Sequence, residues 1–259
     1  MTFHKKGKEI FLTGVSALFL MSVLSFIGTG EVKAEEAGPG KALYGKYCAA
    51  CHGEKGDAKG AVCSSTTVEK SGRSITTFSR DFTLGVFKFR TTSTGCLPDD
   101  TDLMATIDNG IPKSFMPSFA DLPTQEKKDI IAYLQEFSER WFEEDPCDLI
   151  AINIPSYVGS PESIEKGKQV YKDMKCWECH GETGKGDGSK SAELKDDWGH
   201  KIVPFDFTSG DLKRGTSPEA VYITFSSGLD GSGMPSYEDT LKEEDRWHIV
   251  SYTLKLMGK

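Results

Sequence analysis

The feature that most constrains this chain of 259 residues is an internal repeat. The stretch YCAACHGEKGDAKG at residues 47–60 recurs as KCWECHGETGKGDG at residues 175–188. Further along, NGIPKSFMPSF at residues 109–119 recurs as SGLDGSGMPSY at residues 227–237. Because the matching pieces keep their order, the repeat predicts that the chain folds as two copies of one structural unit.

The first 34 residues are typical of a secretory signal peptide. Lysines precede an apolar run over residues 10–27, and small residues around Ala34 form a cleavage-like site. We therefore expect cleavage after Ala34 and export to the periplasm or an equivalent compartment. The alternative is an uncleaved membrane anchor, because the apolar run is long enough to span a bilayer.

The rest of the chain divides at a segment that is rich in proline. We expect a first unit, a linker and a second unit over residues 35–145, 146–160 and 161–259. The linker lacks helical spacing, so we expect it to lie against the units. Ser160 and Pro161 predict the start of a helix. Apolar residues at helical spacing predict that each unit closes with a helix, over residues 124–140 and 243–256.

The charge of the exported chain is acidic. The whole chain has 31 basic and 39 acidic side chains. Residues 1–34 hold four lysines and two glutamates, so 27 basic and 37 acidic side chains remain, a net charge of −10. Nucleic acids and anionic membranes bind basic surfaces, so neither is expected as a partner.

Each copy of the repeat carries the motif Cys-x-x-Cys-His. Two cysteines at this spacing fit a zinc site, a thiol-disulfide redox pair or the attachment site of a c-type haem. On a helix, Cys48, Cys51 and His52 lie on one face, so one short segment can hold a porphyrin edge and supply an imidazole to its iron. The same argument applies to Cys176, Cys179 and His180.

A second iron ligand must then come from the opposite side of the ring. Met116 and Met234 suit this role, because each lies in a repeated loop before a closing helix. A thioether is a soft, uncharged ligand, and ligation by Met and His raises the reduction potential. His200 is the rival to Met234, since it lies in a segment expected to pass near the second haem.

Both copies resemble class I cytochrome c domains, and the whole chain resembles a tandem dihaem c-type cytochrome. The resemblance implies an all-α fold, with a few helices around each of two covalently attached haems. It implies that the four motif cysteines bind the haems and that His52, Met116, His180 and Met234 ligate iron. It also implies a proline carbonyl that accepts a hydrogen bond from the proximal histidine. Pro204 is the candidate for His180, whereas Ser79 stands at the equivalent position of the first copy.

Other side chains have two possible roles. Arg90 and Arg214 recur at similar points, either as contacts to the haem propionates or as solvated surface residues. Trp198 either donates its indole N–H to a propionate or only packs. Of the remaining cysteines, Cys63 and Cys96 are expected to form a disulfide, with a thiolate ligand to iron as the alternative.

The function expected from these features is that of an exported electron carrier rather than an enzyme. With both axial positions filled, single electrons would pass between redox proteins, such as a membrane or periplasmic oxidoreductase, and no small-molecule substrate is expected. Three alternatives stay open: a dihaem peroxidase, a thiosulfate-oxidising dihaem enzyme that uses Cys96 as a ligand, and a haem subunit of a larger oxidoreductase complex.

Overall fold

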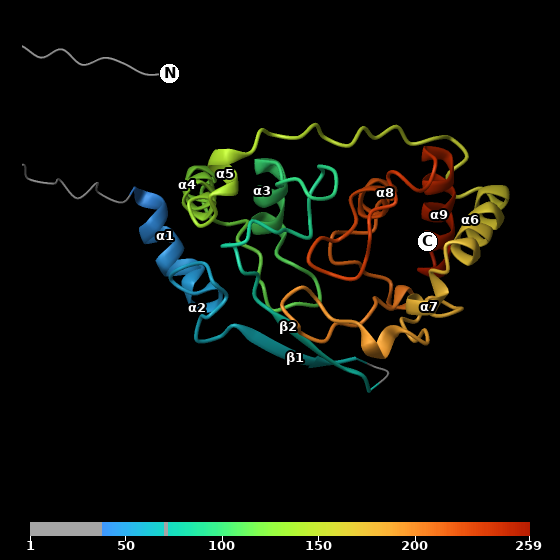
Figure 1. The fold of residues 1–259 in the computed structure, drawn as a ribbon, viewed down its shortest axis with the longest axis horizontal. Helices are drawn as coiled ribbons and strands as arrows, with labels where there is room; N and C mark the ends of the chain where they lie inside the picture. The colour runs from blue at the N-terminus through green and yellow to red at the C-terminus, as the bar shows by residue number, and fades with distance from the viewer. Residues whose placement is uncertain (1–37, 70–71) are drawn as a thin grey trace, which may run out of the picture. The chain divides into compact units, whose positions relative to one another are not determined.

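The structure is a computed structural model that describes residues 38–69 and 72–259 (Figure 1). The expected signal peptide and its cleavage after Ala34 lie outside the described residues. Among the residues that are described, no helix is long and apolar enough to cross a membrane.

The first half of the described chain is mainly helical. Its elements are α1 (Pro39–Tyr47), α2 (Ala49–His52), β1 (Ser64–Val68), β2 (Ser74–Phe78), α3 (Asp100–Asn109), α4 (Thr124–Gln135) and α5 (Arg140–Glu143). The second half contains α6 (Pro161–Asp173), α7 (Trp177–His180), the short 3₁₀ turns η1 (Ser191–Glu193) and η2 (Phe207–Ser209), α8 (Pro218–Ser227) and α9 (Glu243–Leu256). The helix predicted at Pro161 is present, and the Ser160 side chain accepts a hydrogen bond from the Ser163 N–H at 3.2 Å. This contact caps the first turn of α6.

In each half, the first helix packs closely against the closing helix, α1 against α4 and α6 against α9. A glycine makes each approach possible. A Cβ on Gly40 would lie 2.1 Å from the carbonyl oxygen of Asp129, and one on Gly167 would lie 2.0 Å from that of His248. No larger side chain fits at either place without moving a backbone. These two glycines set the distance between the paired helices.

Each half buries its own hydrophobic cluster. In the first half the cluster includes Tyr44, Phe82 and Leu103 with the apolar face of α4. In the second half it is built around Trp247, with the faces of α8 and α9. The predicted apolar faces of both closing helices are therefore buried, as their spacing required.

The expectation of an all-α chain is met only in part. Residues 64–78 contain an antiparallel hairpin in which Ser64 pairs with Phe78 and Val68 with Ser74. The β-branched residues of SSTTV and SITTF favour strands over helices. The hairpin contacts the second half, since the Phe78 ring stacks on His200 at 3.8 Å and Arg73 Nη1 donates to the Gly186 carbonyl at 3.0 Å.

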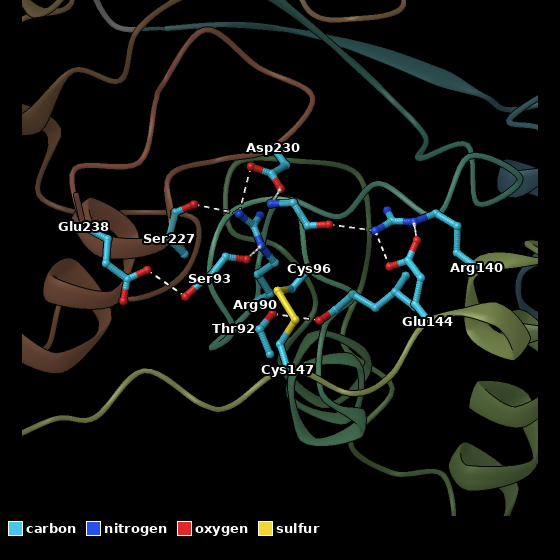
Figure 2. The surroundings of a disulfide bond; sticks show 12 residues. Arg90, Thr92, Ser93, Cys96, Arg140, Glu144, Cys147, Ser227, Asp230 and Glu238 are labelled. Carbon is cyan, nitrogen blue, oxygen red and sulfur yellow. Dashed lines mark hydrogen bonds and ion pairs between the residues drawn. A yellow bond between two sulfur atoms is a disulfide. The ribbon is translucent and has the colours of Figure 1, made fainter. Parts of the chain in front are cut away.

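The two halves also meet at a fully buried arginine. Arg90 donates to the Phe87 and Ser93 carbonyls of its own half, at 2.9 and 3.1 Å. Its Nη2 donates to the Ser227 carbonyl at 2.6 Å and pairs with Asp230 at 2.8 Å, and both of these partners belong to the second half (Figure 2). One guanidinium group thus joins the two halves.

The disulfide predicted between Cys63 and Cys96 is wrong. Cys96 is bonded to Cys147, and Cys63 is free (Figure 2). The reason is that the start of the linker runs back along the loop at residues 91–97, where the Ile150 N–H donates to the Thr91 carbonyl at 2.7 Å. That pairing brings Cys147 beside Cys96, a contact between segments that sequence proximity does not reveal.

Candidate haem-binding sites

The two Cys-x-x-Cys-His motifs fold as short helices. In α2 the His52 N–H donates to the Cys48 carbonyl at 2.9 Å, and in α7 the His180 N–H donates to the Cys176 carbonyl at the same distance. Within each motif the two cysteines and the histidine therefore lie on one helical face, as the haem interpretation required.

The chemistry of the cysteines disfavours the zinc and redox interpretations. None of the four motif cysteines takes part in a disulfide. Burial raises the pKa of Cys48 and of Cys176 to about 11, whereas redox-active Cys-x-x-Cys pairs have a lowered pKa. Within residues 38–69 and 72–259, no group of three or more His, Cys, Asp or Glu side chains is placed to hold a metal ion.

Each motif histidine has a neutral imidazole ring that is buried and stacked on a phenylalanine. Burial lowers the pKa of His52, and it lowers that of His180 to about 4. The His52 ring stacks on Phe82 and the His180 ring on Phe207, with centroids 4.5 and 4.7 Å apart. A neutral imidazole whose Nδ1 faces the protein leaves Nε2 available to iron.

The carbonyl behind each histidine lies one residue later than expected. His52 Nδ1 donates to the Arg80 carbonyl at 2.9 Å, not to Ser79. In the second half, the carbonyl that raises the pKa of His180, against the larger effect of burial, is that of Phe205 and not that of Pro204. Among the described residues, no acceptor lies at hydrogen-bonding geometry to His180 Nδ1. A hydrogen bond to this nitrogen orients an iron-bound imidazole.

The repeated Asp-Phe-Thr sequence, at residues 81–83 and 206–208, explains which carbonyl faces each histidine. The N–H of Phe82 donates to the Gly56 carbonyl at 2.7 Å, and the N–H of Phe207 donates to the Gly184 carbonyl at 2.7 Å. These bonds fix each phenylalanine beside its histidine, so the carbonyl two residues earlier faces the imidazole. The recurrence was visible in the sequence, but its role required the tertiary structure.

A buried tyrosine ties each motif to the preceding helix. The Tyr44 hydroxyl donates to the Gly53 carbonyl at 2.8 Å, and the Tyr171 hydroxyl donates to the Gly181 carbonyl at 2.6 Å. Both carbonyls belong to the residue after the motif histidine. These tyrosines do not stand out as a repeated pair in the sequence, because the second lies one residue further from its motif than the first.

The two methionine loops have the same internal hydrogen bonds. In the first, the Met116 carbonyl accepts from Ile111 N–H at 3.1 Å and the Met116 N–H donates to Ser114 Oγ at 3.1 Å. In the second, the Met234 carbonyl accepts from Leu229 N–H at 3.0 Å and the Met234 N–H donates to Ser232 Oγ at 3.4 Å. The two methionines are therefore presented on equivalent backbones.

A glycine lets each methionine loop close. Gly110 and Gly228 have φ values of +63° and +67°. A Cβ on either would come within 2.6 Å of the backbone next to the following Pro117 or Pro235. Only glycine satisfies both the left-handed backbone and the close approach.

The second site encloses a cavity of about 760 Å³. The cavity is lined by Cys176, Cys179 and His180 of the motif and by Met234 of the methionine loop. A porphyrin with two thioether bonds and two axial ligands needs this donor set and a large, mostly apolar cavity. The residues at the second site therefore fit a c-type haem.

At the first site, the same donors gather around one hydrophobic cluster. Cys48 and Met116 both pack against the cluster that contains Phe82, the ring on which His52 stacks. The chemistry of this donor set matches that of the second site.

The remaining predicted residues lie between the halves. Arg214 donates to the Arg90 carbonyl at 2.9 Å and pairs with Asp102 at 3.2 Å. Both arginines predicted as propionate contacts are thus bonded to protein groups. His200 lines the second cavity, but its ring is stacked on Phe78 and its Nδ1 lies 3.3 Å from the carboxylate of Asp196.

Comparison with known proteins places both halves among the cytochromes c. Residues 164–256 match the cytochrome c family, and residues 35–134 match the family described as cytochrome c oxidase, cbb3-type, subunit III. A solved chain of the reducing HAO-like protein complex from Kuenenia stuttgartiensis is 38% identical, with a TM-score of 0.78. The match covers 85% of this chain and 96% of that one. No curated protein matches the chain significantly.

The chain therefore belongs to the c-type cytochromes and is a tandem dihaem cytochrome with two covalently bound haems. Its chemistry is haem-based electron transfer. Cys48 and Cys51 would hold the first haem, and Cys176 and Cys179 the second. The haem irons supply the one-electron chemistry, while the chain fixes the axial ligands and the polarity around them.

Proposed function

We propose that the chain passes single electrons between redox proteins through two haems, each ligated by a histidine and a methionine. The observation that carries this proposal is the equivalence of the Met116 and Met234 loops. If both methionines ligate iron, both haems are six-coordinate, and neither iron has an open position for a substrate. That arrangement suits a carrier rather than an enzyme.

The disulfide removes the main basis for one enzymatic alternative. A thiosulfate-oxidising dihaem enzyme of this sequence would use Cys96 as a thiolate ligand to iron. Cys96 is bonded to Cys147 and has no thiolate to offer. A disulfide is also typical of proteins that fold in an oxidising compartment, which supports the proposal that the chain is exported to the periplasm.

A second candidate is a haem subunit of a larger oxidoreductase complex. Two observations favour it. The solved chain that matches over 96% of its length is part of an HAO-like protein complex. In addition, the segment from α5 into the linker exposes large apolar side chains, namely Phe142, Leu149, Ile152 and Ile154. Exposed apolar residues on one stretch of chain are typical of a surface that a partner covers.

Replacement of the methionines tests the ligand assignment. Met116→Ala should open only the first haem and Met234→Ala only the second, and each should remove about half of the weak long-wavelength sulfur-to-iron absorption. Intact-mass measurement should still show two haems in each variant. An unchanged band in both variants would refute the assignment, and rapid turnover of peroxide by the unmodified protein would refute the carrier function.

Salt dependence and particle size separate the two candidates. A transient carrier with an acidic surface should dock on a basic partner, so its electron-transfer rate should fall as ionic strength rises. A permanent subunit should instead co-elute with its partner in gel filtration of a cell extract prepared under non-denaturing conditions. Its electron-transfer rate should not depend on ionic strength.

A further inference from the structure

The cavity at the second haem site is built from both halves of the chain. The second half supplies the motif of α7 and Met234, while the first half supplies β2, residues 79–81 and residues 88–89. Figure 1 shows the hairpin reaching toward the second half, and the stacking of Phe78 on His200 fixes it there. The second haem is thus enclosed in part by side chains from the first half.

Cations from both halves line this cavity. Arg80 and Lys88 come from the first half, and Lys213 and Arg214 come from the second. Arg214 is paired with Asp102. Within the described residues, no carboxylate lies within 4.0 Å of the charged groups of the other three.

Arg80, Lys88 and Lys213 are half-buried and have no carboxylate of the described residues in direct ion-pair contact. Burial, together with the nearby Arg80 and Lys213, lowers the pKa of Lys88 to about 8, against the weaker pull of Asp196. Burial also lowers the pKa of Arg80 to about 10, against the weaker opposite effect of Asp196, Asp197 and Asp81. A buried positive charge is costly unless an anion compensates it. The cavity therefore favours an anionic ligand group beside Arg80 and Lys88.

Two neutral donors beside these cations are also without acceptors. Trp198 Nε1 and Ser79 Oγ are buried, and neither has a hydrogen-bond partner among the described residues. Both residues line the cavity. The Arg80 guanidinium lies 4.3 Å from the centroid of the Trp198 ring. Since buried donors almost always have a partner, these two also indicate an acceptor within the cavity.

The methionine loop of the second half packs onto the side chains of Arg80 and Trp198. Gly231 has a φ of +74°, and a Cβ there would lie 2.5 Å from the Trp198 ring and 2.9 Å from Arg80 Nη1. The loop that presents Met234 therefore rests directly on Arg80 and Trp198.

Arg80 also belongs to the first haem site through its main chain. Its carbonyl accepts the hydrogen bond from His52 Nδ1 at 2.9 Å, while its side chain lines the second cavity. One residue thus contacts the proximal ligand of one haem and the surroundings of the other.

A haem carries two propionate carboxylates, and carboxylates are the anions that Arg and Lys bind most readily in proteins. We propose that Arg80 and Lys88 of the first half bind the propionates of the second haem, with Trp198 Nε1 as an additional donor, so that Arg80 links the two haem sites. The inference deepens the proposed function, because it assigns the residues that set the potential of the second haem relative to the first.

The test is a potentiometric titration of full-length, haem-loaded variants followed by visible spectroscopy. Met116→Ala identifies which of the two potentials belongs to the first haem. Removing a cation near a haem favours oxidised iron, which carries one more positive charge. Arg80→Gln and Lys88→Gln should each shift the second haem's reduction equilibrium about tenfold toward the oxidised state, which is about 59 mV for a one-electron couple.

Two control variants sharpen the result. Arg80→Lys keeps the charge and should keep most of the potential. Lys128→Gln removes an exposed lysine of α4 and should leave both potentials unchanged. In the Arg80→Gln and Lys88→Gln variants the potential of the first haem should change less than that of the second, because the backbone carbonyl that faces His52 is retained.

The outcomes distinguish this inference from the proposed function. Unchanged potentials in both Arg80→Gln and Lys88→Gln, with two haems and the methionine band intact, would overturn the inference and leave the carrier function standing. A larger shift at the first haem than at the second would also overturn it. If Arg80→Gln fails to assemble, Lys88→Gln and Arg80→Lys still decide the question. Absence of the methionine band in the unmodified protein would instead overturn the proposed ligation.

Discussion

Replacing Arg90 with methionine should destabilise the contact between the two halves more than any change at the surface. The Arg90 side chain is completely buried, and its guanidinium donates to three backbone carbonyls and pairs with Asp230. Methionine fills similar space but offers no donor. The variant would leave the Ser227 carbonyl without its donor from the opposite half (Figure 2). Among the described residues, Asp230 would keep only its hydrogen bonds from Thr94 Oγ1 and the Gly95 N–H.

The magnitude follows from the burial of both partners. Removing one member of a buried ion pair costs about 3–5 kcal/mol, because the other is left uncompensated. The Asp230 side chain is 21% exposed, so water can solvate it in part, and it keeps its hydrogen bonds from Thr94 and Gly95. We therefore expect a loss near the lower end, about 3 kcal/mol of the free energy of unfolding.

The assay is chemical denaturation followed by far-ultraviolet circular dichroism, which is not obscured by the haems. A double-mutant cycle with Asp230→Asn should give a coupling of about 1–3 kcal/mol, because the two side chains are in direct contact. Arg140→Met is the matched control, since the Arg140 guanidinium bonds to Gly85 and Gly95 of its own half. A loss below about 1 kcal/mol for Arg90→Met, or a cycle that is additive within error, would refute the reasoning.

Three further predictions concern single contacts. Cys147→Ser should lower the free energy of unfolding by about 4 kcal/mol in the chain-entropy model, because the bond to Cys96 spans 51 residues of sequence. Thiol labelling of Cys96 and Cys147 in the unmodified protein would contradict the bond. Gly40→Ala should destabilise the protein by about 1–3 kcal/mol, because its Cβ would meet the backbone of α4, whereas Gly45→Ala in the same helix has open space and should stabilise it by up to about 1 kcal/mol; equal effects in thermal melts would contradict the close crossing. Tyr171→Phe should cost about 0.5–1.5 kcal/mol, since the Gly181 carbonyl loses the tyrosine donor and keeps, among the described residues, only the Gly184 N–H at 3.3 Å, and a denaturation midpoint equal to that of the parent would count against this bond.

Much of the site could be predicted from the sequence because the chemistry there is local. Two cysteines and a histidine within five consecutive residues share a helical face whatever the rest of the chain does. The repeated loops with Met116 and Met234 could be aligned by eye. The helix starting at Pro161 and the closing helix at residues 243–256 carry their own capping and spacing signals.

Other features could not be read from the sequence, because they depend on which distant segments meet. The Cys63–Cys96 prediction relied on nearness within the first copy, but the returning linker brings Cys147 to Cys96 instead. The hairpin at residues 64–78 was not predicted, and its contact with His200 depends on how the two halves pack together.

The two haem-attachment motifs can be recognised from residue order alone, because covalent attachment needs only a short run of residues in one helical turn. The tertiary structure decided which charges surround the haems, because burial and pairing depend on long-range packing. Arg90 shows this directly: the sequence left open a propionate contact or a solvated surface position, whereas the side chain is buried between the halves and bonded to protein acceptors. Arg80 carries no motif of its own, yet the fold places its carbonyl at His52 and its side chain in the cavity of the other half.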